Sequence, residues 1–214
     1  MNAPRSAGST RSTSTRLTAH AVVGAPVLMA LYGGIRLVPG SREPGPGWTT
    51  GHALMLAGLL LFAPILLALR RLLAPRGTVA GRLAAGAALG VAFAGLVASV
   101  LQIGIDLYVG VASATKGDQT RMFERIQAVP GVLTAVYEVG PLLFYVGLLA
   151  LLVAASVGAA RTLRWWSPVL MVAGTLGSMV DLAFIPLAAV CYLIALSPLI
   201  LGGRRWAAGR TVRV

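Results

Sequence analysis

Three acidic residues lie at the ends of long apolar runs of the chain, where a carboxylate is costly and is therefore often functional. They are Asp106, Glu138 and Asp181, half of the six acidic residues in the sequence. A carboxylic acid in an apolar pocket has a raised pKa and can hold a proton near neutral pH. These three residues are the candidates for a general acid, or for the polar contacts of a bound ligand.

Each of these acids ends a stripe of polar side chains at helical spacing, so each stripe predicts one polar helix face. The stripes are Ser99, Gln102 and Asp106; Thr134, Glu138 and Tyr145; and Thr175, Ser178 and Asp181. If the stripes turn inward, Arg36 and His52 join them in an outward-facing polar pocket. The predicted ligand-binding residues are Arg36, His52, Gln102, Asp106, Glu138, Tyr145 and Asp181.

A structural role is the alternative for the same residues. Side chains at helix ends are partly hydrated, so the carboxylates could simply face water or lipid headgroups. Arg36 could also pair with Glu138 or Asp106 as a clamp between helices.

The sequence predicts no cofactor and no metal site. His52 with two acids could hold zinc, but no HxxxH, HExxH or DxxD spacing supports such a site. His20 and His52 fall at opposite ends of their predicted helices, so they cannot ligate one haem iron. The single cysteine, Cys191, allows neither an internal disulfide nor a thiolate cluster.

The elements that must position these residues are transmembrane helices. The chain is 57% hydrophobic and 11% charged, with a mean hydropathy of +0.83, whereas a soluble domain has about 25% charged residues. Since a span needs about 20 apolar residues, we predict an all-α integral membrane bundle of six transmembrane helices. The predicted spans are residues 19–38, 51–72, 82–106, 132–158, 165–182 and 184–202.

These spans form one predicted membrane domain over residues 17–203, between a disordered tail (1–16) and a basic tail (204–214). Thirteen of the 18 basic residues fall on one side of this topology and five on the other. By the positive-inside rule, both termini are cytoplasmic and the protein is a multi-pass protein of the cell membrane. The scatter of Arg residues between apolar runs makes the lipid bilayer the expected partner and excludes nucleic acid.

Several local patterns refine this bundle. Residues 116–129 predict a short external amphipathic helix, with Asp118 as its N-cap, which would lie on the membrane surface or cover the outer mouth. Gly86 and Gly90 form a GxxxG pair that predicts close helix packing. Four Trp residues flank the spans, Trp48 among them, as expected for interfacial belts.

Three segments carry a resemblance to known proteins. They are GPGWTTGHALMLAGLLLFAP (45–64), QIGIDLYVG (102–110) and YEVGPLLFYVGLLAL (137–151), and they resemble parts of small, uncharacterised multi-pass membrane proteins of actinobacteria. The resemblance implies a helical membrane bundle from a GC-rich Gram-positive source. It implies no activity and no site residue.

Three functions follow from these patterns. The first is a membrane protein whose outward-facing polar pocket binds or passes a small or lipidic ligand. The second is a membrane enzyme with a carboxylic general acid, such as a terpene-cyclase-like isomerase, although 7% aromatic residues are few for stabilising cationic intermediates. The third is a structural or partner-binding membrane subunit. The sequence indicates neither the ligand nor the oligomeric state.

Overall fold

The computed structural model describes residues 8–73, 78–157 and 163–200, and within these ranges the ordered elements are all helical. The elements are α1 (Gly8–Arg36), α2 (Pro46–Leu73), α3 (Val79–Ala112), α4 (Lys116–Gln127), the π-helical turn η1 (Leu133–Glu138), α5 (Val139–Val157), α6 (Trp166–Val180), the 3₁₀ turn η2 (Leu182–Phe184) and α7 (Ile185–Leu196).

Five helical segments are long and apolar enough to cross a membrane, which confirms the predicted all-α membrane bundle. They are Arg16–Arg36, Pro46–Leu73, Val79–Ala112, Leu133–Val157 and Leu182–Ile200. The fifth predicted span, residues 165–182, corresponds to α6, which is apolar but has only 15 residues. At 1.5 Å per residue α6 covers about 22 Å, less than the hydrocarbon core of about 30 Å.

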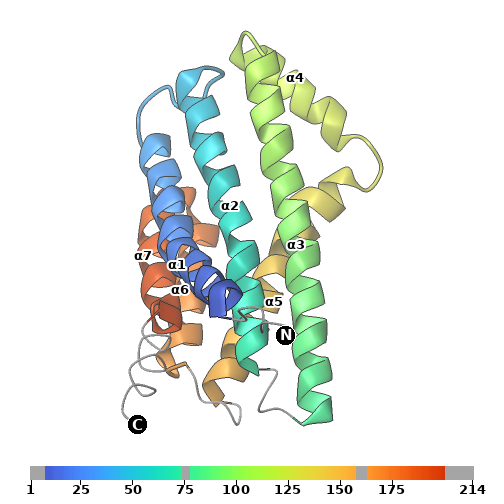
Figure 1. The fold of residues 1–214 in the computed structure, drawn as a ribbon. Helices are drawn as coiled ribbons and strands as arrows, with labels where there is room; N and C mark the ends of the chain where they lie inside the picture. Colours follow the sequence, from blue (N-terminus) through green and yellow to red (C-terminus); the bar gives the residue numbers. More distant parts are fainter. Residues whose placement is uncertain (1–7, 74–77, 158–162, 201–214) are drawn as a thin grey trace, which may run out of the picture.

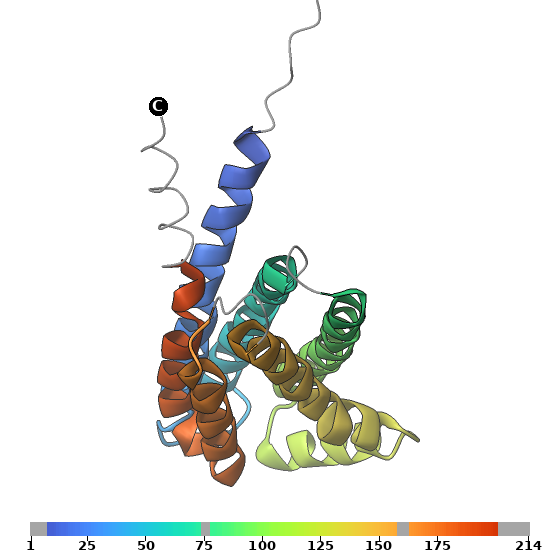
Figure 2. The same ribbon diagram turned by 90° about the horizontal axis from the view of Figure 1, so that it is seen from below.

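The helices pack mainly against partners close in sequence. α1 packs against α2 and α7, α3 packs against α5 and α2, and α6 forms a hairpin with α7 (Figures 1 and 2). The connections α1–α2 and α3–α4 lie at one end of the bundle together with α4 (Figure 1). We call this end the outer end, following the predicted topology. The outer end contains Arg36, Trp48 and the last turns of α3.

Glycines allow the close contact between α3 and α5. A Cβ atom on Gly95 would overlap the backbone of Phe144, and one on Gly147 would overlap the backbone of Ala92. The predicted GxxxG contact is wrong, because a Cβ on Gly86 or Gly90 would have no neighbour within 4 Å among the described residues. Gly90 and Gly95 are five residues apart, or about 140° around the helix, so they lie on different faces.

Three helices, α1, α2 and α3, extend beyond their predicted limits. α3 continues to Ala112, so Asp106 lies inside the helix and not at its end. α1 begins at Gly8, within the tail that the sequence predicts to be disordered. No Gly or Pro interrupts residues 9–23, so nothing in that stretch breaks the helix.

Candidate functional site at the outer end

A histidine and an aspartate face each other between α2 and α3 at the outer end. His52 is only 3% exposed, and its Nε2 lies 3.9 Å from Asp106 Oδ2, beyond hydrogen-bond distance. His52 Nδ1 lies 2.8 Å from the Trp48 carbonyl oxygen. Because a carbonyl only accepts, Nδ1 carries a proton, and Nε2 is left to face the carboxylate.

Asp106 is held by two further aromatic residues. The Tyr137 hydroxyl donates to Asp106 Oδ1 at 3.1 Å, and Trp48 Nε1 donates to the Asp106 backbone oxygen at 2.7 Å. The Asp106 side chain is 14% exposed. Three segments, α2, α3 and η1, therefore meet at this one carboxylate, which keeps a narrow access to the outside.

Helix α1 adds an aromatic ring and a cation. The Tyr32 ring meets the His52 ring edge to face, with 5.4 Å between centroids, and Arg36 Nη1 donates to the Tyr32 hydroxyl at 3.3 Å. Arg36 Nε is buried and has no hydrogen-bond partner within the described chain. The predicted clamp is not formed, because neither Asp106 nor Glu138 lies within 4 Å of the Arg36 guanidinium.

We call these residues the outer polar cluster: Tyr32, Arg36, Trp48, His52, Asp106 and Tyr137. Of the predicted ligand-binding residues, the structure brings Arg36, His52 and Asp106 together here. The ring of Trp48 stacks on His52 with 4.0 Å between centroids, so the imidazole is enclosed by aromatic rings on two sides.

Glu138 does not join this cluster. It is exposed, and within the described residues it makes no hydrogen bond or ion pair. Its neighbour Tyr137 points to Asp106 instead. Both residues lie in the π-helical turn η1, in which Tyr137 is half-buried and Glu138 is exposed.

Asp181 also lies apart from the cluster and has a local structural role. Its exposed carboxylate accepts a hydrogen bond from the Ala183 amide at 2.8 Å, which caps η2 in the turn between α6 and α7. The convergence of the three acids in one pocket is therefore not what the structure shows.

The remaining two predicted residues lie deeper. Gln102 is half-buried one turn below Asp106, with no hydrogen bond within the described chain. The Tyr145 ring lies 6.5 Å from the ring of Tyr192, whose hydroxyl is 2.8 Å from Thr175 Oγ1. Tyr145 therefore belongs to a second polar group, which joins α5, α6 and α7.

Three members of the cluster are absent from the sequence-based set: Tyr32, Trp48 and Tyr137. Helical spacing could have identified two of them, because Tyr32 precedes Arg36 by four residues and Trp48 precedes His52 by four. Trp48 is half-buried and contacts Asp106 and His52. Its assignment to an interfacial belt stays a prediction, and the structure adds these two contacts to it.

Helix α4 covers one side of the cluster, which gives the predicted external helix a defined position. The Phe123 ring lies 6.2 Å from the Trp48 ring. Lys116 Nζ lies 5.8 Å from the centroid of Trp48 and donates to the Arg42 carbonyl oxygen at 3.2 Å. These contacts tie α4 to the α1–α2 connection as well as to Trp48.

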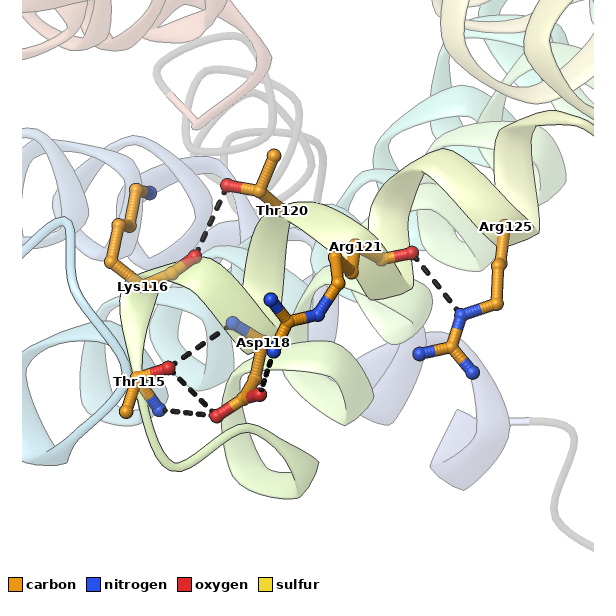
Figure 3. A network of polar contacts seen from close by, with 6 residues as sticks. All are labelled: Thr115, Lys116, Asp118, Thr120, Arg121 and Arg125. Atoms are coloured by element: carbon orange, nitrogen blue, oxygen red, sulfur yellow. Dashed lines mark hydrogen bonds and ion pairs between the residues drawn. The ribbon is translucent and has the colours of Figure 1, made fainter.

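The N-terminus of α4 is fixed by a capping box (Figure 3). The N-cap is Thr115 and not the predicted Asp118, which occupies the third helical position and accepts hydrogen bonds from the Thr115 hydroxyl at 2.7 Å and the Thr115 amide at 3.1 Å. The Thr115 hydroxyl bond and the bond from Arg121 hold the pKa of the Asp118 carboxyl below its ordinary value.

The cluster offers proton-transfer and hydrogen-bonding groups. No group of three or more His, Cys, Asp and Glu residues suited to a metal occurs in the described ranges.

No family model, curated protein or solved structure matches this chain. The resemblance to actinobacterial membrane proteins therefore stays a prediction.

Proposed function

We propose that this protein is an integral membrane protein that binds or passes a small or lipidic ligand at the outer polar cluster. The supporting observation is the position of His52 and Asp106, which face each other among apolar helices at 3.9 Å without a direct hydrogen bond. Burying two such groups is costly unless their hydrogen-bonding capacity is used. A ligand that donates hydrogen bonds to Asp106 Oδ2 or to His52 Nε2, which is the acceptor of a neutral imidazole protonated on Nδ1, would use it.

The Arg36 guanidinium supports the same proposal. A buried Nε without a partner is a donor that an incoming acceptor could satisfy, and a guanidinium offers its donors in a fixed fork. The cluster thus presents an acceptor, Asp106, and a donor, Arg36, to one polar molecule.

A membrane enzyme with a carboxylic general acid is the second candidate. The chain has few aromatic residues, but four of them gather here: Trp48 and Tyr137 on Asp106, Tyr32 on His52 and Phe123 on Trp48. Aromatic faces stabilise cations, and Asp106 lies between a hydroxyl and an imidazole that can exchange a proton with it. Incubating the protein in D₂O with C10 to C20 polyprenyl diphosphates tests this candidate, because protonation of an alkene would add deuterium to the product.

The binding function is tested by identifying what the protein carries. Wild-type protein and the His52→Phe variant are purified from the same membranes, and the small molecules released by solvent extraction are compared by mass spectrometry. We expect the wild type to carry a molecule that the variant lacks, because His52→Phe keeps the ring stack but removes both ring nitrogens. Equal extracts from the two folded proteins would contradict the proposal.

A further inference from the structure

A second group of unpaired polar atoms lies at the outer end, between α4 and the α1–α2 connection. Gln119 is fully buried, yet its Nε2 has no hydrogen-bond partner in the described chain. Its Oε1 accepts a hydrogen bond from Lys116 Nζ at 2.7 Å. The same Nζ donates to the carbonyl oxygen of Arg42 at 3.2 Å, so Gln119 lies beside residues 41 and 42.

Two serines are close to these residues in the sequence. Ser41 precedes Arg42, and Ser113 precedes the N-cap of α4 by two residues. Their Oγ atoms are also buried without a hydrogen-bond partner among the described residues. Unsatisfied buried polar atoms are rare in folded proteins, so Gln119 Nε2, beside the Lys116 ammonium, needs an occupant.

The charge at this position indicates the chemistry of that occupant. No carboxylate lies within 4 Å of Lys116 Nζ in the described chain. The Gln119 amide nitrogen can only donate, and the serine hydroxyls can donate as well. A water molecule could accept from Gln119 alone, whereas an anion would accept from both Gln119 Nε2 and the Lys116 ammonium.

We infer that Lys116, Gln119, Ser41 and Ser113 form a binding site for an oxygen-rich anion, a phosphate or carboxylate group. The group enters from the aqueous side, because Lys116 is exposed. It could belong to a soluble anion or to a lipid headgroup, which share this chemistry. The inference does not depend on the proposed function at Asp106, since none of the four residues contacts that carboxylate.

Lys116 is the only lysine in the chain, so its reactivity reports on this site alone. The full-length protein is placed in phosphatidylcholine nanodiscs and acylated with an amine-reactive ester, and modification of Lys116 is followed by peptide mass spectrometry. Sodium phosphate and sodium acetate are compared with sodium chloride at equal ionic strength. The same reaction in nanodiscs that contain phosphatidylglycerol tests whether a lipid headgroup occupies the site.

We expect the occupied site to slow acylation of Lys116 by about tenfold, since one charge-assisted hydrogen bond corresponds to roughly that factor. Slowing by soluble phosphate or acetate assigns the site to a free anion. Slowing only in phosphatidylglycerol assigns it to a lipid headgroup. An acylation rate that none of these anions changes would overturn the inference.

Two variants separate binding from folding. Gln119→Glu supplies an internal carboxylate to Lys116, so this variant should fold normally, as judged by its thermal unfolding, and should lose the dependence on added anion. Arg125→Gln removes an exposed charge from the same helix and should keep that dependence. Asp106→Asn should also keep it, which distinguishes failure of this site from failure of the outer polar cluster. Protection that survives in Gln119→Glu would contradict the site.

Discussion

The chemistry of this protein is concentrated on a few residues that share protons and hydrogen bonds. His52 has one nitrogen committed to the Trp48 carbonyl and the other directed at Asp106. Asp106 in turn receives the hydroxyl of Tyr137. Nε2 and Oδ2 lie 3.9 Å apart with no direct hydrogen bond between them, so both atoms can still bond to a ligand.

Trp48 is the residue that fixes the relative position of α2 and α3 at this point. Trp48→Phe should lower the free energy of unfolding by about 1 kcal/mol, because it removes the hydrogen bond to the Asp106 carbonyl oxygen but keeps a ring against His52. Unfolding in mixed micelles of increasing SDS content measures the change. Trp165→Phe is the matched control, since Trp165 is 72% exposed. Equal losses of unfolding free energy in the two variants would contradict the role of Trp48 in fixing α2 against α3.

At the scale of elements, the helices position the cluster through a few close contacts and one irregular turn. The π-helical turn η1 immediately precedes α5 and carries Tyr137, and π-helical turns are rare and frequently occur at functional sites. In the last turn of α3, Gly110 leaves room for the indole ring of Trp48. The absence of a side chain at Gly110 therefore allows the Trp48 ring to reach the Asp106 backbone oxygen.

Two glycines of α3 give a paired prediction about packing. Gly95→Ala should lower the free energy of unfolding by about 1–3 kcal/mol, because the methyl group would overlap the Phe144 backbone. Gly90→Ala should leave stability unchanged or raise it by up to about 1 kcal/mol, since nothing lies near its Cβ position. Denaturation in SDS ranks the two variants. A destabilised Gly90→Ala would show that this face has a partner.

The capping box of α4 predicts a pH dependence that is local to the covering helix. The folded-state pKa of Asp118 is lowered, so its contribution is complete above the ordinary Asp pKa of about 4 and is lost as the pH falls through the lower folded value. Hydrogen-exchange protection factors of residues 116–120 should be higher in the wild type than in Asp118→Asn at pH 7. The two proteins should converge near pH 2. A difference that persists there would contradict the carboxylate's role.

The sequence predicts some of these elements well and others poorly, for physical reasons. Apolar runs identify the membrane helices because length and hydropathy are local properties. The sequence predicts Glu138 because it is an acid in a polar stripe, whereas the position of Tyr137 depends on the face that α5 buries against Gly95 and Ala98. Asp181 resembles a membrane-embedded acid in sequence, but it caps a turn that only the α6–α7 hairpin creates.

At the scale of the whole molecule, the outer polar cluster and α4 lie at one end of the bundle, and several Arg residues lie at the other. Arg70, Arg82 and Arg164 lie near the end opposite to α4, and Lys116 lies at the outer end. The orientation across the membrane stays a prediction of the positive-inside rule, by which the outer polar cluster faces away from the cytoplasm.

The orientation can be measured with the single lysine. A membrane-impermeant sulfonated amine-reactive ester added to intact cells should modify Lys116, because the predicted topology places α4 outside. A cysteine introduced at Arg164 in a Cys191→Ser background should react with an impermeant maleimide only after the membrane is opened. The reverse pattern would invert the topology and place the cluster on the cytoplasmic side.

We propose that Asp106, and not the other acids of the outer end, carries the proposed ligand-binding function. The most direct measurement compares Asp106→Asn with Glu138→Gln, two equivalent carboxylate-to-amide changes, by quantifying the molecule that each purified protein releases on extraction. We predict that Asp106→Asn retains less than about a tenth of the wild-type amount, as expected for the loss of one charged hydrogen bond, and that Glu138→Gln retains it fully. Equal retention by the two variants, or loss only in Glu138→Gln, would contradict the account.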